Sequence, residues 1–217
     1  MKESPPPATN NTTRSTRWAK RGADMDSIWE SAYARLQQIA PIPENEWEAF
    51  RKLCSIQTVA KNAHWVRENE PVDAIAFCAK GLFRLYYATP DGGEFNKSFC
   101  SAHDFVASYG ALLAGSPSHF SIQALADSLL LTVRYSDFRA LYDRHPCWER
   151  LGRILVEQLY MKKELREREF LLLSAEARYL KFLERYGPLE TLIPQYHVAS
   201  YLGITPVALS RIRRKLT

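Results

Sequence analysis

The segment from Ile193 to Leu216, IPQYHVASYLGITPVALSRIRRKL, constrains the fold of this chain more than any other. It begins with apolar residues at the spacing of one buried helical face, namely Val198, Ala199 and Leu202. Gly203 follows them and can adopt the left-handed conformation that ends a helix. Thr205 and Pro206 then supply an N-cap and a first helical residue. The segment therefore predicts two short helices joined by a tight turn.

The second of these helices combines an apolar stripe with a basic surface. Leu209, Ile212 and Leu216 recur at helical spacing and are expected to pack inward. The remaining surface is polar and basic: Ser210, Arg211, Arg213, Arg214 and Lys215. A short, capped, basic helix braced by another helix is typical of the helix-turn-helix that reads the major groove of DNA. The alternative is a helical hairpin whose arginines form an ordinary solvated face.

The distribution of charge favours the DNA-binding interpretation. The chain has a net charge of +5, from 29 basic and 24 acidic residues. Residues 1–24 hold five basic and two acidic side chains, and residues 174–217 hold seven and three, whereas residues 25–173 hold 17 and 19. The excess positive charge therefore lies at the two ends, which suits one electropositive face on a body that does not bind polyanions generally.

Composition excludes several classes of protein. Apolar residues make up 46% of the chain, which is enough for one large domain or two small ones. No run approaches the roughly 18 apolar residues of a membrane span, and the N-terminus has no apolar stretch of the signal-peptide type, so we expect a cytoplasmic protein without a membrane partner. No nucleophile elbow, glycine-rich phosphate loop or acid pair indicates an enzyme.

The cysteines and histidines predict neither a metal site nor a cofactor. Cys54, Cys78, Cys100 and Cys147 lie far apart and form no CxxC pair, so free buried thiols are expected. The histidines show no HxH or HxxxH spacing, which argues against a cupin-type metal enzyme with a similar barrel.

Residues 1–24 are rich in Pro, Thr, Asn and basic side chains and nearly lack apolar ones. They cannot bury enough surface to fold alone, and we interpret them as a disordered arm. Met25 begins the first helical periodicity and is an alternative start of translation, whereas the functional alternative is a basic arm that contacts the DNA backbone.

Periodicity divides the rest of the chain into three parts. Residues 25–54 show helical spacing interrupted by Pro41 and Pro43, and six short β-type runs follow: 56–66, 74–78, 81–88, 94–100, 119–126 and 129–135. Pro90-Asp91-Gly92-Gly93 is a hairpin turn, since its glycines can take positive φ. Many short strands without intervening long helices predict a closed antiparallel barrel or jelly roll.

Residues 146–173 predict one long helix with an apolar stripe of near-heptad spacing flanked by mixed charges. Such a stripe indicates packing against a partner helix, and its proposed dimer contacts are Leu151, Leu155, Leu159 and Leu165. A helix lying on its own barrel is the alternative, and both can hold along different turns. Ser174 then resembles the N-cap of a new helix.

This order of elements resembles the catabolite activator and FNR-type (Crp/Fnr) family of bacterial regulators. Phe105 to Phe138 resembles the effector-pocket region of that family without gaps, and Ile193 to Leu216 resembles its DNA-binding motif. The resemblance implies an α+β fold: an N-terminal antiparallel β jelly roll over residues 25–145, a dimerisation helix over 146–173 and a helix-turn-helix domain over 174–217. It also implies a homodimer on double-stranded DNA, an effector pocket in each jelly roll and a contact with RNA polymerase.

Residue-for-residue match to the family motif implies the stretch that faces DNA: Thr205, Pro206, Val207, Ala208, Ser210, Arg211 and Arg214. Val207 stands where the family commonly has a glutamate. Arg211 is expected to contact guanine O6 and N7, and Arg214 a phosphate. The β-hairpin wing that usually follows in the family is expected to be missing or cut off, because the sequence ends at Thr217.

The pocket departs from the pattern of the family's cyclic AMP binders. Those proteins have Gly-Glu where this chain has Ala107-Ser108, and Arg followed by Ser or Thr where it has Ser118-His119. A buried phosphate without its arginine loses a bidentate charge-assisted pair, so cyclic nucleotide binding is not expected. The candidate pocket residues are aromatic and mildly polar: Phe83, Arg84, Tyr86, Phe105, Ser108, Tyr109, His119 and Phe120.

These observations favour a non-enzymatic, sequence-specific transcription regulator whose unknown small-molecule effector is not cyclic AMP. Two alternatives remain open. One is a constitutive DNA-binding protein with a vestigial barrel, and the other is a small-molecule-binding barrel whose C-terminal hairpin makes protein contacts.

Overall fold

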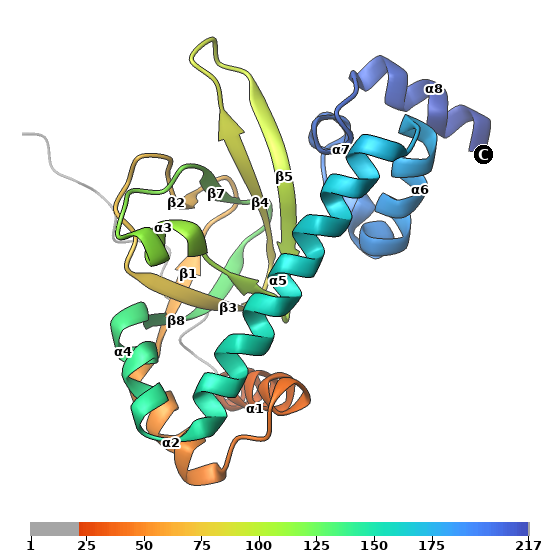
Figure 1. The fold of residues 1–217 in the computed structure, drawn as a ribbon. Coiled ribbons are helices and arrows are strands. Elements are labelled where there is room, and N and C mark those ends of the chain that lie inside the picture. Colours follow the sequence, from red (N-terminus) through yellow and green to blue (C-terminus); the bar gives the residue numbers. More distant parts are fainter. Residues whose placement is uncertain (1–21, 217) are drawn as a thin grey trace, which may run out of the picture.

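A computed structural model describes residues 22–216 as a β jelly roll, a long helix and a C-terminal helical unit (Figure 1). The arm expected over residues 1–24 lies outside the described residues except for its last three. Those three residues begin α1 (Gly22–Ile39), so the boundary at residue 24 was wrong and helical structure starts earlier.

Two helices precede the strands. α1 is followed by α2 (Glu44–Leu53), and the break falls at the two prolines as expected. Gln37 holds the connection, because its side-chain amide donates to the Ile42 carbonyl at 2.7 Å and accepts from the Ile42 amide at 3.0 Å. Both helices contribute to an aromatic core, α2 through Trp47, and this core also includes Trp148. These helices cover one end of the jelly roll.

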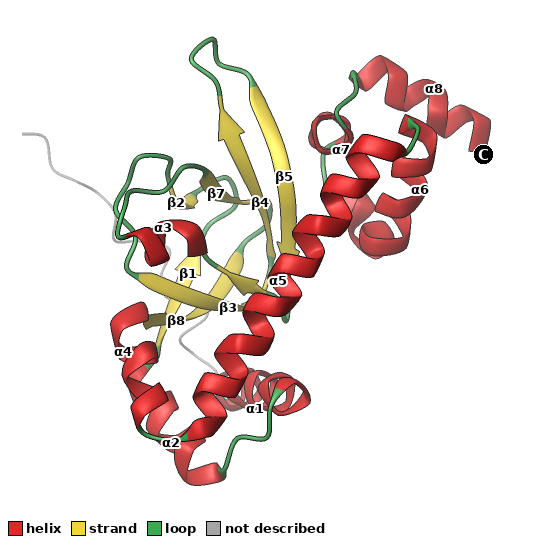
Figure 2. Ribbon diagram, in the orientation of Figure 1, coloured by secondary structure: helices red, strands yellow, loops and turns green. Residues whose placement is uncertain are grey.

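The strands form two four-stranded antiparallel sheets. One sheet has the order β1 (Ser55–Val59), β8 (Ser128–Arg134), β3 (Ala74–Lys80) and β6 (Phe105–Val106). The other has the order β2 (His64–Val66), β7 (Ser121–Ala124), β4 (Leu82–Ala88) and β5 (Glu94–Ser101). The crossovers between non-consecutive strands are those of a jelly roll, which confirms the predicted fold (Figure 2).

Two details differ from the sequence prediction. The run over 56–66 is two strands, because a turn with Asn62 at positive φ separates β1 from β2. β6 was not predicted, since two residues are too short to show alternation. The β4–β5 hairpin turns where expected, and of its two glycines Gly92 takes positive φ, at 85°.

Helices also connect the sheets to each other and β8 of the first sheet to the long helix. α3 (Tyr109–Ala114) lies between β6 and β7, and α4 (Tyr135–Ala140) continues into a 3-10 turn at Leu141–Asp143. α5 (Pro146–Leu172) then runs diagonally across the jelly roll (Figure 1). Its start is fixed by buried Glu46, whose carboxylate accepts from Trp148 at 3.0 Å and Arg144 at 2.9 Å. These hydrogen bonds hold the pKa of Glu46 below its usual value.

The C-terminal helical unit comprises α6 (Ala175–Tyr186), a 3-10 segment (Gly187–Leu192), α7 (Gln195–Leu202) and α8 (Pro206–Leu216). Ser174 caps α6 as expected, accepting from the Ala177 amide at 3.2 Å. The unit shares one hydrophobic core with the jelly roll, because Leu82, Phe99 and Leu125 pack among its apolar side chains. The position of α7 and α8 is therefore coupled to strands β4 and β5.

Candidate nucleic-acid interface and effector cavity

α7 and α8 meet across the tight turn that the sequence predicts. Gly203 has φ of +68°, and the Ile204 amide donates back to the Ala199 carbonyl at 3.1 Å. The Thr205 hydroxyl accepts from the Ala208 amide at 3.2 Å and caps α8. A Cβ at position 203 would come within 2.6 Å of the Phe170 ring of α5. Gly203 is thus required both for its backbone conformation and for a close approach to α5.

α8 packs on the unit through one edge and exposes the rest. Leu209 is 1% exposed and Ile212 is partly buried, whereas Leu216 is 43% exposed. The expectation that Leu216 packs inward was wrong, because it lies in the last turn beyond the reach of α6 and α7. Six of the candidate DNA-facing residues are exposed and Ala208 is half-buried; the exposed ones are Thr205, Pro206, Val207, Ser210, Arg211 and Arg214.

The basic residues of α8 differ in their partners. Arg213 forms an ion pair with Glu190, with a nitrogen–oxygen distance of 3.6 Å. Arg211 and Arg214 make no ion pair with any residue in the described range 22–216. Two exposed guanidinium groups are therefore available to an external anion, while the third helps to hold α8 to the 3-10 segment before α7.

The apolar stripe of α5 divides along its length. Leu151 is 1% exposed and belongs to the aromatic core of its own chain, and Leu155 packs against the same core. Leu151 is therefore unavailable to a partner helix, contrary to its assignment as a dimer contact, and Leu155 is only partly exposed. Leu159 and Leu165 are 36% and 45% exposed. The second half of α5 adds further exposed apolar residues: Val156, Tyr160, Met161, Phe170, Leu171 and Leu172.

A cavity of about 270 Å³ lies between the jelly roll and the middle of α5. Its apolar wall includes Phe105, Tyr109 and Phe120, as predicted for the effector pocket, and Leu155 and Leu159 close it from α5. The cavity therefore borders α5, the same helix whose second half exposes apolar side chains.

Five of the predicted pocket residues lie elsewhere: Phe83, Arg84, Tyr86, Ser108 and His119. Arg84 and Tyr86 point out of the jelly roll because Phe83 and Leu85 occupy the inward positions of β4, and successive side chains of a strand alternate. Phe83 is fully buried in the interior without lining the cavity. His119 is exposed in the loop before β7.

Ser108 occupies the position where the family's cyclic AMP binders place a glutamate, and Ser118 the position of their arginine. Both serines are buried, and their hydroxyl oxygens lie 2.8 Å apart in a hydrogen bond. The Ser118 hydroxyl also lies 2.7 Å from the Phe120 carbonyl. Neither serine lines the cavity. In this chain, these two positions therefore hold small side chains that hydrogen-bond to each other and offer no cation to a cyclic phosphate.

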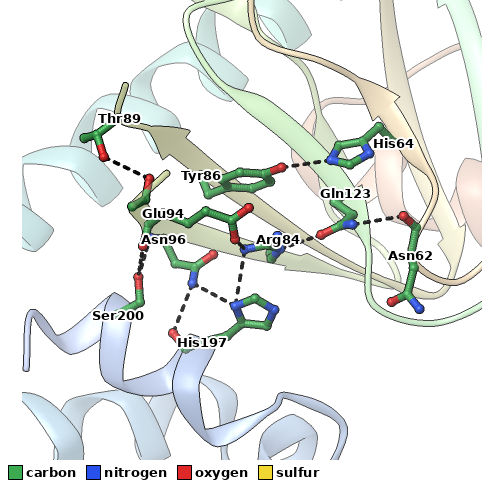
Figure 3. A network of polar contacts seen from close by, with 11 residues as sticks. Asn62, His64, Arg84, Tyr86, Thr89, Glu94, Asn96, Gln123, His197 and Ser200 are labelled. Atoms are coloured by element: carbon green, nitrogen blue, oxygen red, sulfur yellow. Dashed lines mark hydrogen bonds and ion pairs between the residues drawn. The ribbon is translucent and has the colours of Figure 1, made fainter. Parts of the chain in front are cut away.

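Arg84 instead joins the jelly roll to α7 (Figure 3). It donates to Gln123 of β7 at 2.7 Å and to Glu94 of β5 at 2.6 Å, and it faces the Nδ1 atom of His197 at 3.3 Å. The Asn96 amide lies 3.2 Å from the same nitrogen. Burial and the neighbouring Arg84 cation lower the pKa of His197 to about 4, so the imidazole is neutral and accepts at Nδ1.

The basic wall of the cavity was not predicted. Lys97 of β5 and Lys162 and Lys163 of α5 line it, beside buried Cys100. A register shift in the β4–β5 pairing leaves Lys97 without a partner residue, since Leu85 pairs with Ser98 and Tyr86 with Asn96. Such a bulge redirects a side chain. Strict alternation along β5 could not have revealed this orientation.

Other kinds of site find no support among the described residues. No group of three His, Cys, Asp or Glu side chains in residues 22–216 is placed to hold a metal ion. Within the same residues, no helix combines the length and the apolar composition needed to cross a membrane.

Comparisons with known proteins agree with this geometry. Residues 56–145 match the model of the cyclic nucleotide-binding domain family. FixK2 from Bradyrhizobium japonicum superposes with a TM-score of 0.65 at 18% identity, covering 75% of this chain and 84% of its own. CLP of Xanthomonas campestris, a c-di-GMP-responsive global regulator, gives 0.63 at 14% identity, covering 78% and 89%.

The catabolite activator protein of Thermus thermophilus gives a TM-score of 0.53 at 18% identity, covering 84% of this chain and 86% of its own. No curated protein sequence matches the chain significantly. The resemblance drawn from the sequence is thus confirmed at the level of fold: residues 56–145 match the cyclic nucleotide-binding domain model, and the chain shares the fold of the solved FixK2 and Thermus thermophilus catabolite activator structures.

Proposed function

We propose that the protein is a dimeric, sequence-specific DNA-binding transcription regulator that responds to a small molecule other than cyclic AMP. The observation that carries this proposal is α8. This capped helix is braced by α6 and α7 and exposes two arginines that make no ion pair in the described part of the chain. A helix presented in this way fits the major groove, where an arginine can read guanine.

The roles proposed for the two arginines differ. Arg211 lies one turn after the N-terminal end of α8, beside Val207 and Ala208, and we assign it to a base edge. Arg214 lies nearer the C-terminal end and is assigned to a phosphate. Valine and alanine at 207 and 208 contribute apolar contact, for example to a thymine methyl group.

Selection of binding sites from random DNA with the purified protein tests this assignment. Arg211→Ala should lose about 1–3 kcal/mol at one G·C pair per half-site and relax the preference there. Arg214→Ala should weaken binding to all sequences about equally and reduce the salt dependence. If the selected sites share no G·C position, or if Arg211→Ala keeps the wild-type ratio of specific to random binding, the assignment is wrong.

The second half of α5 supports a dimer. Tyr160 is 64% exposed, and Leu171 and Leu172 are 73% and 72% exposed. Large exposed apolar side chains gathered on one element are typical of an interaction surface. A two-fold pairing of α5 helices would cover them and place two α8 helices on one side of the assembly.

Tyr160→Glu tests the dimer more cleanly than a change at Leu155, which packs within its own chain. This substitution should convert a sedimenting dimer to monomer and weaken DNA binding strongly, since a charge would be buried in the interface. Phe95→Glu, at a residue of β5 that is 56% exposed, is the matched control. An unchanged sedimentation coefficient for Tyr160→Glu would remove this face from the interface.

A further inference from the structure

The cavity beside α5 has two chemically different parts. Aromatic and aliphatic side chains from the jelly roll form one, including Phe105, Phe120 and Leu85. Lysines from two elements form the other: Lys97 of β5 with Lys162 and Lys163 of α5. A concave apolar surface with a few convergent charged groups is the usual form of a small-molecule site.

The three lysines lack carboxylate partners. No ion pair joins Lys97, Lys162 or Lys163 to any acidic side chain within residues 22–216. The three arginines of the lining have other partners: Arg185 pairs with Glu169 at 2.8 Å, Arg166 donates to the Tyr201 carbonyl, and Arg35 donates to Gln38 at 3.3 Å. Within the described residues, the positive charge of the lysine cluster is therefore offset only in part: against the effect of burial, the Asp104 carboxylate and nearby side chains raise the pKa of Lys162 without forming an ion pair.

Lys97 shows that this arrangement has an energetic cost. Its ammonium group lies 3.8 Å from the centroid of the Phe120 ring and 5.2 Å from that of Tyr87. Burial and the nearby Lys163 lower the pKa of Lys97 to about 8. A half-buried ammonium that is stacked on aromatic rings and lies beside a second cation is stabilised when an anion enters the cavity.

The one acidic residue of the lining limits the charge of that anion. The Asp104 carboxylate accepts from the Ser101 amide at 2.8 Å and stays on the same side of the cavity as Lys162. A nearby negative charge disfavours a dianion more than a monoanion. The hydrogen-bonded pair of Ser108 and Ser118 separately offers no cation to a cyclic phosphate.

We propose that the cavity binds a small organic acid, with its carboxylate held by Lys97 and Lys162 and an aryl or short acyl body against Phe105 and Phe120. The proposal names the chemical class of the effector. Only the claim that this ligand regulates DNA binding rests on the proposed function. Binding itself is a property of the isolated protein and can be measured without DNA.

Calorimetric titration of the full chain with 4-phenylbutyrate and with octanoate tests the proposal. We expect saturable binding at one site per chain, with the neutral amides of the same two acids binding at least about tenfold more weakly. Lys97→Met and Lys162→Met should each weaken the acids about tenfold or more, because each removes one charge while keeping an apolar stem. Lys52→Met on α2, remote from the cavity, should leave affinity unchanged.

Three outcomes would overturn the proposal. They are the absence of saturable binding of either acid at millimolar concentration, equal affinity for acid and amide, and tighter binding of phenyl phosphate than of the carboxylates. Thermal unfolding of each variant establishes that a loss of binding is not a loss of fold. Site selection on DNA is carried out without these acids, so failure here and failure of the proposed regulator function give different results.

The pH dependence gives a second readout. Affinity for the acids should fall about tenfold between pH 7 and pH 9, because Lys97 loses its proton in this range. The other titratable groups facing it are Lys162, Lys163, Cys100, Asp104 and Tyr87. Burial raises the pKa of Cys100 to about 11, and nearby groups raise that of Lys162, so neither titrates in the same range. Lys97→Met should remove this dependence, and an unchanged slope in that variant would contradict the role of Lys97.

Discussion

The two sides of strand β5 differ in whether their side chains find partners within the chain. On the outer side, Phe99 is fully buried against Tyr186 and Tyr201 of the C-terminal unit, and Asn96 bonds to His197. On the inner side, Lys97 and Cys100 face a cavity in which no lysine of the cluster forms an ion pair with a carboxylate of the described residues. The outer side is completed by a folded core, whereas we propose that the inner side is completed by a bound ligand.

This difference separates polar residues that hold the fold together from polar residues that we propose bind a ligand. Arg84 and His197 are buried and the pKa of His197 is lowered, which on its own would mark a candidate functional site. Both nevertheless have partners within the chain. Lys97 is equally perturbed and has no acidic partner in the described structure. The presence of a partner, rather than the size of the pKa shift, therefore distinguishes the two roles.

The largest expected effect breaks the outer side. Phe99→Ala should lower the free energy of unfolding by about 3–5 kcal/mol, because it leaves a cavity in the core shared by the jelly roll and the C-terminal unit. Urea denaturation measures the change. Phe95→Ala, four residues earlier and exposed, should cost far less. Similar losses in the two variants would show that the shared core does not hold the units together.

A smaller effect concerns His197, whose folded-state pKa of about 4 lies below its ordinary value of 6.5. The unfolded chain binds more protons between these values, so stability is fully present above pH 6.5 and is lost as the pH falls toward 4. His197 should contribute about 3 kcal/mol of destabilisation between pH 7 and pH 4. His197→Asn should reduce the pH dependence by that amount, and identical slopes for both proteins would contradict it.

The smallest effect concerns the inner side and has the opposite sign. Lys97→Met should raise the free energy of unfolding at pH 7 by about 1–2 kcal/mol, because it removes a partly desolvated ammonium without a carboxylate partner. Lys52→Met on the exposed face of α2 is the control. A destabilised Lys97→Met protein would mean that the lysine is a structural residue and would weaken the contrast between the two sides of β5.

Local patterns predicted most of the fold because each element has its own period. Helical spacing and the capping residues Ser174, Thr205 and Gly203 located the C-terminal helices correctly. The mixture of strands and turns gave the jelly roll. β6 escaped notice because it is two residues long and is held by pairing with β3 rather than by its own pattern.

The cavity was predicted less well, since its lining depends on which way each strand residue points. Phe83 and Arg84 were both assigned to the pocket, although neighbours on a strand face opposite sides. That error was avoidable from the sequence. The orientation of Lys97 was not, because it follows from a register shift between β4 and β5. The division of α5 into a buried and an exposed half likewise depends on where the N-terminal helices cover it.

The shared core has a consequence for how this protein can be divided. The sequence suggests a modular chain in which residues 174–217 could be cut away and studied alone. Leu82, Phe99 and Leu125 supply part of the interior of that module from the jelly roll. We expect a fragment of residues 174–217, deprived of them, to be less stable than the same residues in the whole chain, because small domains bury a smaller share of their surface. We therefore expect the two parts to unfold together. A chimera that takes residues 174–217 from another protein would also need the matching outer surface of β4 and β5.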